Sequence, residues 1–388
     1  MYLGTVASLL VGATVRLAID SRDAMGWMLT TLTLAAVSLP FLVALHEVGH
    51  AVFGRLVGLE VFQIVVGGGR TLWRGRIAGV LVSVGETPLS GLTLVSTARP
   101  RFARLQRAIV SLGGPAANLV FAAALLPLTP LVFPYALPNL ARAGIAALFW
   151  TSLGLALLNL VPMRVNVRGA RIASDGLRVL GSLFARAATL REWLLAHYAA
   201  AWHTAEAVTD IPGMLDAARA GSAAFPESAQ MAMMLIVAVN WGGDARAARD
   251  LTRELLERTD LAPIVRAFAK SNLAFFEFLV GEDGDRDEAD RLSSEVIAAI
   301  PWHPSIRAVR AAVMLWLNQP EPALEQLQAA REDDEDGGRH GDVALLLSIA
   351  YAQLARLEEA RRFLEQGERL ASPAPLRERA RLALQRAL

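Results

Sequence analysis

The sequence predicts a mostly α-helical protein in two parts, a polytopic membrane domain followed by a soluble α-solenoid. Three observations support this prediction. The first half contains long apolar runs edged with arginine, and 54% of the whole chain is hydrophobic. The two halves are oppositely charged. Residues 1–190 hold 16 of the 38 basic residues and six of the 37 acids, which gives a formal charge of +10. The remaining residues have a formal charge of −9. The second half also shows amphipathic helices with a loose internal repeat.

Three core membrane spans are expected, because three apolar runs reach the roughly 20 residues that a helix needs to cross a bilayer. Residues 1–18 are also apolar up to Arg16, so a fourth span at the N-terminus and a helix at the membrane interface both stay open. Between the first two spans, residues 59–98 alternate β-branched runs with glycine, which is typical of strands and turns. We therefore expect a membrane domain at residues 1–190 with a small β-rich insertion, and core spans at about residues 25–53, 104–133 and 141–161.

Arginine is concentrated on one side of these spans. Eight arginines lie in or beside the β-rich insertion, and three more follow the third span at Arg164, Arg168 and Arg171. The loop between the second and third spans has only Arg142 nearby. By the positive-inside rule, the insertion and the chain after the third span face the cytoplasm. We expect a multi-pass protein of a bacterial inner membrane, embedded in the lipid bilayer, with a cytoplasmic C-terminal domain.

The first span ends in a motif with catalytic chemistry, His46-Glu47-Val48-Gly49-His50. Two histidines four residues apart point from the same face of a helix, so their ring nitrogens can bind one zinc ion. Glu47 lies one position further round and can act as general base on a zinc-bound water in peptide hydrolysis. Ionisable groups cost about 2.5–3.5 kcal/mol or more near the centre of a bilayer and are rarely found there without a function. The alternative is a degenerate site retained for packing.

A catalytic zinc site needs a third protein ligand. Between Glu86 and Glu192 the chain contains one acid and no histidine, and that acid is Asp175, just after the third span. Asp175 is the best candidate, since the preceding helix returns to the side of the HEVGH motif. The alternative is that Asp175 caps the helix that begins at Gly176. The chain has no cysteine, which excludes a thiolate metal site and a cysteine nucleophile.

Further motifs follow the HExxH sequence in a characteristic order. The second span contains Gly113-Gly114-Pro115 with Asn118, and the third ends in Asn159 and Pro162, followed by Asp175-Gly176. Together these motifs resemble the site-2 protease family of intramembrane zinc metalloproteases, over roughly residues 25–185. The stretch from Val61 to Gly91 is also similar to the membrane-associated β region of that family. In many members the aspartate follows the NxxP motif closely, whereas residues 163–174 separate the two motifs here.

The resemblance implies that His46, His50 and Asp175 bind one zinc ion and that Glu47 is the catalytic base. It implies a transmembrane protein as substrate, cut within or at the edge of the bilayer in regulated intramembrane proteolysis. Asn118 and Asn159 would hold the substrate backbone or an oxyanion, although hydrogen bonding between helices explains them equally well. Gly114 and Pro115 are expected to serve helix packing.

Residues 191–388 are expected to form a soluble domain of tetratricopeptide-like (TPR-like) helix pairs. Small residues open the second helix of successive units at Ala247, Ala289, Ala323 and Ala360, which gives spacings of 42, 34 and 37 residues. Such spacing is typical of helix pairs in which a small residue permits close packing. The expected partner of the repeats is the substrate or a protein regulator. The acidic charge of this half argues against nucleic acid.

Two classes of function compete at this point. The first is an intramembrane zinc metalloprotease whose repeats recruit substrate or a regulator. The second is a catalytically inactive, membrane-anchored TPR scaffold. The intact set of His46, Glu47, His50 and Asp175 favours the protease. A metal transporter is disfavoured because no chain of acids leads across the predicted spans.

Overall fold

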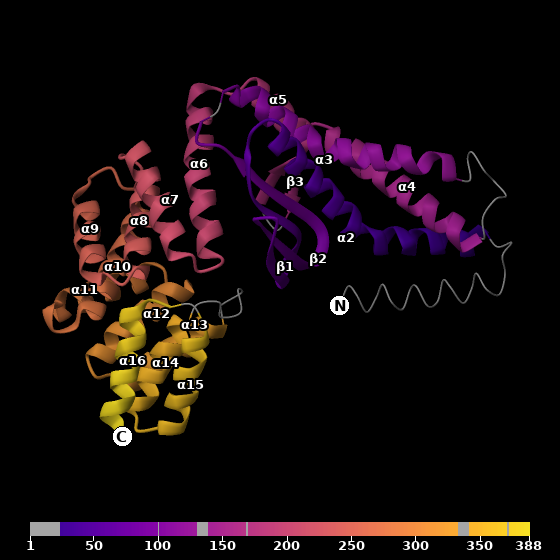
Figure 1. The fold of residues 1–388 in the computed structure, drawn as a ribbon. Coiled ribbons are helices and arrows are strands. Elements are labelled where there is room, and N and C mark those ends of the chain that lie inside the picture. The colour runs from indigo at the N-terminus through magenta and orange to yellow at the C-terminus, as the bar shows by residue number, and fades with distance from the viewer. Residues whose placement is uncertain (1–23, 100, 130–138, 168–169, 333–340, 371) are drawn as a thin grey trace. The chain divides into compact units, whose positions relative to one another are not determined.

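The computed structural model describes residues 24–99, 101–129, 139–167, 170–332, 341–370 and 372–388 (Figure 1). The chain forms two compact units, Met1–Ala200 and Ala201–Leu388, which are described separately below. The possible span at residues 1–18 lies outside the described residues. Helix α6 (Ala187–Glu206) runs through the junction of the units, so the domain boundary expected after residue 190 stays a prediction.

Three long helices form the frame of the first unit: α2 (Ala24–Leu56), α3 (Ala103–Leu125) and α4 (Asn139–Leu160). Within the described residues they provide three segments long and apolar enough to cross a membrane, Met28–Leu56, Ala103–Leu128 and Leu140–Leu160. The last turn of the second segment is the 3₁₀ helix η1 (Leu126–Leu128). The three expected core spans are thereby confirmed. Each of the three helices contacts the other two (Figure 1).

The outer faces of these helices are apolar. Phe41 on α2, Val120 on α3 and Leu158 on α4 are each more than half exposed. Exposed apolar surface of this extent is unfavourable in water and is typical of a face that contacts lipid. The inward faces carry small or polar residues, including fully buried Asn118 and Ser152. The helix frame is therefore apolar toward its surroundings and polar where the helices meet.

The predicted β-rich insertion is confirmed as two long antiparallel strands, β1 (Glu60–Ile77) and β2 (Val80–Ser96). The turn at Ala78 and Gly79 has positive φ at both residues, as a tight two-residue hairpin requires. The hairpin folds back on itself, because Ile64 of β1 pairs with Val82 on one side and with Thr93 on the other. Within the described residues, the 91–96 segment of β2 pairs on one side only. This edge segment is the part of the hairpin that reaches α2.

A second, short hairpin follows α4. Strands β3 (Arg164–Val167) and β4 (Ala170–Ala173) pair antiparallel, and helix α5 (Asp175–Leu183) begins directly after them. The hairpin starts and ends at the same point, because Ser174 N–H donates to the carbonyl of Met163 at 3.0 Å. The Ser174 hydroxyl also donates to the carbonyl of Val161 at 2.7 Å. The chain therefore leaves the end of α4, forms the two strands and returns to the same point.

The second unit is a stack of antiparallel helix pairs, as the repeat pattern predicted. Several helices begin at a capping side chain that accepts a backbone N–H, such as Asp210, Ser228, Asp244 and Asp285. The pairs are α8 with α9, α10 with α11, α12 with α13, and α14 with α15, preceded by α7 and followed by α16. Their bounds are α7 (Ile211–Ala224), α8 (Ala229–Trp241), α9 (Ala245–Glu257), α10 (Pro263–Val280), η2 (Gly281–Asp283), α11 (Arg286–Ala299), α12 (Pro304–Trp316), α13 (Pro320–Glu332), α14 (Asp342–Gln353), α15 (Leu357–Arg369) and α16 (Ala374–Ala387).

The small residues that define the repeat lie where the paired helices touch. Ala289, Ala323 and Ala360 are each fully buried, as their positions in the repeat predicted. In the first pair the fully buried residue is Ala248, whereas Ala247 is only partly buried. The register expected at Ala247 is therefore off by one residue. The physical reason is that α9 turns the following position, not Ala247, toward its partner helix.

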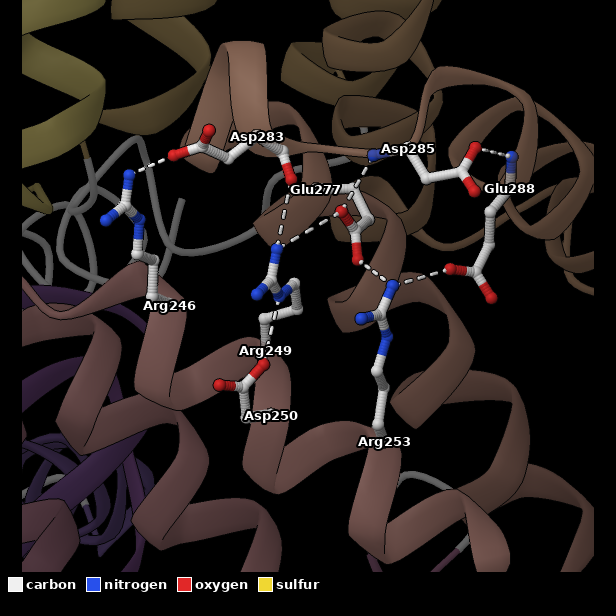
Figure 2. Close-up of polar contacts among 8 residues, drawn as sticks. All are labelled: Arg246, Arg249, Asp250, Arg253, Glu277, Asp283, Asp285 and Glu288. Atoms are coloured by element: carbon white, nitrogen blue, oxygen red, sulfur yellow. Dashed lines mark hydrogen bonds and ion pairs between the residues drawn. The ribbon is translucent and has the colours of Figure 1, made fainter.

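An ionic network around the buried side chain of Glu277 connects three helices of the solenoid (Figure 2). Glu277 on α10 is fully buried and accepts hydrogen bonds from Arg253 of α9 at 2.8 Å and from the backbone N–H of Asp285 at 2.9 Å. Arg253 also donates to Glu288 of α11 at 3.0 Å, and Arg249 of α9 lies 3.9 Å from Glu277. A buried carboxylate without such partners would cost several kcal/mol. Glu277 thus fixes α9 and the start of α11 against α10.

Candidate metal centre

His46 and His50 lie one turn apart on α2 and are both buried where that helix meets α3. Their ring centroids are 4.8 Å apart and the rings are nearly perpendicular. The helix period alone brings these two imidazoles to the same face, as expected from the sequence.

Asp175 completes the cluster from a distant part of the chain. Its Oδ2 lies 3.0 Å from Nε2 of His46, and its Oδ1 lies 3.5 Å from Nε2 of His50. One ligand atom from each of the three residues lies within 4.8 Å of the others, and all three residues are buried. Two imidazoles and one carboxylate are a common donor set for catalytic zinc, and the three leave a fourth position open. The donor set and its spacing therefore fit one zinc ion.

The β3–β4 hairpin explains how Asp175 reaches the histidines. Residues 163–174 form a closed hairpin, so they add length to the chain without moving its ends apart. Helix α5 begins beside the end of α4 and packs on α3. The helix cap is Ser174, whose Oγ accepts the N–H of Leu177 at 3.3 Å. The alternative that Asp175 itself caps this helix is therefore wrong, because the preceding residue does so and leaves the Asp175 carboxylate to face the imidazoles.

The charge state of Asp175 follows from its neighbours. Burial raises the pKa of the Asp175 carboxyl, but hydrogen bonds to His46 and then His50 outweigh burial and hold this pKa below its usual range. The side chain is thus a carboxylate, which is the form that ligates a metal.

Backbone and side-chain acceptors on α3 orient the two imidazoles. His50 Nδ1 lies 2.6 Å from the carbonyl oxygen of Val110, so Nδ1–H donates and Nε2 is left to bind. His46 Nδ1 lies 3.2 Å from the side-chain amide of Asn118, which is fully buried. The Oδ1 of that amide has no hydrogen-bond partner within the described residues. The opposite orientation of the amide lets Oδ1 accept from His46 Nδ1–H and satisfies both groups.

Glu47 is almost completely buried on the other side of the histidines. The hydroxyl of Thr93, from the edge segment of β2, donates to Glu47 Oε2 at 2.6 Å. Gly91 of the same segment lies so close that a Cβ there would be 2.3 Å from Glu47 Oε1. The β-rich insertion therefore reaches the HEVGH motif itself and sets the orientation of the Glu47 carboxylate.

Gly114 of α3 lies directly against the two imidazoles. A Cβ at this position would be 2.5 Å from Nε2 of His46 and 2.5 Å from Nε2 of His50. Any larger residue would fill the space beside these two nitrogen atoms. Pro115 is buried within α3 and cannot donate a backbone hydrogen bond to the preceding turn. The glycine thus has a specific role at the site, beyond the helix packing expected from the sequence.

A cavity of about 400 Å³ opens beside the cluster. Its walls include His46, Glu47 and Asp175, the 90–93 segment of β2 and the end of α4. Asn159 is also part of the wall, and its Nδ2 donates to the carbonyl of Leu155 one turn earlier in α4. Asn118 does not line this cavity, because it lies behind His46. The structure therefore separates the two asparagines, with Asn118 against a candidate ligand and Asn159 against the open space.

The comparisons with known proteins agree with this geometry. Residues 34–138 match the model of peptidase family M50. This range holds the HEVGH motif, the β-rich insertion and the Gly113 to Asn118 motif, and it ends before Asp175. A 58-residue segment is 40% identical to a candidate zinc metalloprotease of Chlamydia pneumoniae, over 15% of this chain and 9% of that protein. The chain thus spans a small part of this relative, and the two findings support a metalloprotease.

Two solved structures are similar to half of this chain. One is a thermophilic TPR protein of Thermus thermophilus, and the other is MamA of MSR-1. Each of the two is 15% identical to this chain. Each match covers 50% of this chain and 98% of the chain in the solved structure, and the TM-scores are 0.37 and 0.29. The helix pairs described above establish the solenoid independently of these two likenesses.

The glycine-punctuated strands of residues 59–95 suggested an edge for an unwound substrate, but the sequence did not reveal the contact of β2 with Glu47. Gly91 was noted as part of a β region, but nothing in the sequence pointed to Thr93 as a partner of Glu47. The two residues are 46 positions apart, and their contact depends on the bulged pairing of β1 and β2. Only the Gly-rich, β-branched character of residues 59–98 signalled that an irregular sheet follows the motif.

Proposed function

We propose that this protein is an intramembrane zinc metalloprotease that hydrolyses peptide bonds within or near the transmembrane segments of membrane proteins, in regulated intramembrane proteolysis. The observation that carries the proposal is the buried group of His46, His50 and Asp175, with Glu47 beside it, on helices with apolar outer faces. The family match supports the protease chemistry. The placement of the site between candidate membrane spans supports a substrate that is itself in the membrane.

His46 and His50 would hold the ion through Nε2, because their Nδ1 atoms face Asn118 and Val110. Asp175 would supply the third ligand and its negative charge. When bound, zinc supplies a Lewis acid and lowers the pKa of a coordinated water. Glu47 takes a proton from the attacking water and later delivers it to the leaving amine. The hydrogen bond from Thr93 engages Oε2 and leaves Oε1 for this proton transfer.

The substrate segment must be extended to react, because a peptide bond within a helix is shielded by its own backbone. The edge segment of β2 supports such a conformation. Residues 91–96 pair with β1 on one side, and Ser90, Gly91, Leu92 and Thr93 line the cavity beside Glu47. An unwound substrate strand could pair with this edge next to the catalytic groups. Replacing Leu92 with proline removes a backbone donor, and unchanged cleavage of a stable transmembrane substrate by a folded variant would refute this role.

The arginine distribution supports the expected orientation, with the HEVGH end of α2, the β-rich insertion and the solenoid on the cytoplasmic side of the membrane. In this arrangement the helical repeats recruit the substrate or a protein regulator on the cytoplasmic face of a bacterial inner membrane. The scaffold alternative is disfavoured, because three candidate ligands and the general base are all present and face one another.

The test is to purify the wild type with Glu47→Gln, Asp175→Ala and Glu60→Gln, and to measure bound zinc and cleavage of single-span membrane proteins. Glu60 is an exposed acid at the start of β1 and serves as the matched control. We expect Glu47→Gln to keep zinc and lose turnover, Asp175→Ala to lose both, and Glu60→Gln to keep both. Equal turnover in all four proteins would refute the protease function.

A further inference from the structure

The solenoid contains a second cavity, which is separate from the metal centre. It has a volume of about 360 Å³ and is lined by the first helices of four successive pairs, α8, α10, α12 and α14. This volume lies within the range of about 300–1,000 Å³ that is typical of ligand pockets. The walls include three aromatic side chains, Trp241, Phe275 and Phe276.

Two residues that line this cavity each carry a side-chain oxygen that is buried and has no hydrogen bond within the described residues. The two atoms are Oδ1 of Asn240 on α8 and Oδ1 of Asp342 in the first turn of α14. Asn240 is only 4% exposed, and no hydrogen bond to its side-chain oxygen occurs within the described residues. Buried polar atoms are almost always paired in folded proteins, so two such acceptors in one cavity require an explanation. Both lack a donor.

The described residues that line the cavity carry charge of one sign. Among the described residues that line it, the ionisable ones are Asp342 and Glu206, and none is basic. Glu206 lies 3.2 Å from the ring of His203, whereas Asp342 has no ion pair within the described chain. Burial raises the pKa of Asp342 to about 7, because its carboxylate loses contact with water. The cavity thus offers an acidic group and a neutral acceptor against aromatic walls.

A metal ion does not fit these groups. Within the described residues, the only group of three or more potential metal-ligating His, Cys, Asp or Glu side chains is the one at His46, His50 and Asp175. A guanidinium group fits better, since its planar N–H donors can serve a carboxylate and an amide oxygen together. Its face can also stack on Trp and Phe rings, which attract a cation when they are shielded from water.

We propose that this cavity binds an arginine side chain presented by an extended segment of a partner protein. The guanidinium donates to Asp342 and Asn240, and the aromatic side chains contact its apolar stem and its face. The acidic charge of the solenoid half, −9 over residues 191–388, attracts a basic segment of this kind. The proposal depends on the solenoid alone, and the protease function can fail without affecting it.

The test uses the purified full-length protein and two fluorescent peptides of nine residues, composed of alanine and glycine with a central arginine or its neutral analogue citrulline. Binding is measured by fluorescence polarisation for the wild type, Asp342→Asn, Asn240→Leu and Glu321→Gln. Glu321 is an exposed acid in the first turn of α13, so its replacement changes the net charge as Asp342→Asn does. Asp342→Asn removes a buried charge and Asn240→Leu removes a buried unpartnered oxygen, so both variants are expected to fold.

The wild type and Glu321→Gln are expected to bind the arginine peptide at least about tenfold more tightly than the citrulline peptide, a difference of about 1.4 kcal/mol. Asp342→Asn is expected to abolish this preference, and Asn240→Leu to weaken it severalfold. Equal binding of the two peptides, no saturable binding at millimolar peptide, or an unchanged preference in Asp342→Asn would each overturn the proposal.

Discussion

Replacing Asp342 with asparagine should stabilise the solenoid, and the effect should depend on pH. Burial raises the pKa of Asp342 from 3.8 to about 7, so the folded protein binds a proton that the unfolded chain releases above about pH 4. Between these two values the stability of the wild type falls as the pH rises. A shift of about three pKa units corresponds to about 4 kcal/mol at most, at 1.36 kcal/mol per unit. Asparagine does not titrate, so Asp342→Asn removes the free-energy cost of holding a buried carboxylate in the folded state.

The free energy of local opening can be measured by hydrogen exchange of the amides in α12 and α14, at pH 4 and pH 8. Asp342→Asn is expected to slow exchange at pH 8 relative to the wild type, and to leave it nearly unchanged at pH 4. Glu321→Gln should have little effect at either pH, because Glu321 is exposed. If Asp342→Asn instead speeds exchange at pH 8, the carboxylate has a stabilising partner and the reasoning is refuted.

Three further substitutions test the site and the solenoid. Gly114→Ala places a methyl group 2.5 Å from Nε2 of His46 and of His50, so the purified variant should contain little zinc. Gly154→Ala is the control: its methyl group meets no atom within 4 Å, and this variant should contain the wild-type amount of zinc. Thr93→Val removes the hydrogen bond to Glu47 and should lower kcat by about 10- to 100-fold with zinc retained. Thr93→Ser keeps the hydroxyl and should have a kcat close to that of the wild type. Full activity of the valine variant would contradict a role of Thr93 in orienting Glu47. Glu277→Ala removes the acceptor of Arg253 and of the Asp285 N–H and should destabilise the solenoid by about 1–3 kcal/mol in thermal unfolding, whereas Glu288→Gln should cost less than about 1 kcal/mol.

The local parts of the site could be predicted from the sequence. His46 and His50 are four residues apart on one helix, so the helix period alone brings them together. Asp175 could be predicted because the segment between Glu86 and Glu192 offers no other acid or histidine. Both predictions use short-range geometry or the exclusion of alternatives, and the structure places all three side chains within contact distance.

The remaining features depend on contacts between distant segments. The hairpin of residues 163–174 closes on itself through Ser174, and a spacing in the sequence cannot show that its ends meet. The contact of Thr93 with Glu47 depends on how the β1–β2 hairpin folds back, which its glycines permit but do not specify. The role of Gly114 follows from the close approach of α3 to the imidazoles of α2. The shift from Ala247 to Ala248 has a similar cause, since helix rotation in a loose repeat is set by packing.

The central claim is that Glu47 acts as the base beside a metal held by His46, His50 and Asp175. The most direct measurement compares zinc content and cleavage of a single-span membrane protein in the wild type and Glu47→Gln, reconstituted in lipid vesicles. We expect about one zinc ion in each protein, with turnover in the wild type and none detectable in the variant. Turnover by Glu47→Gln at the wild-type rate, with zinc bound in both, would contradict the account.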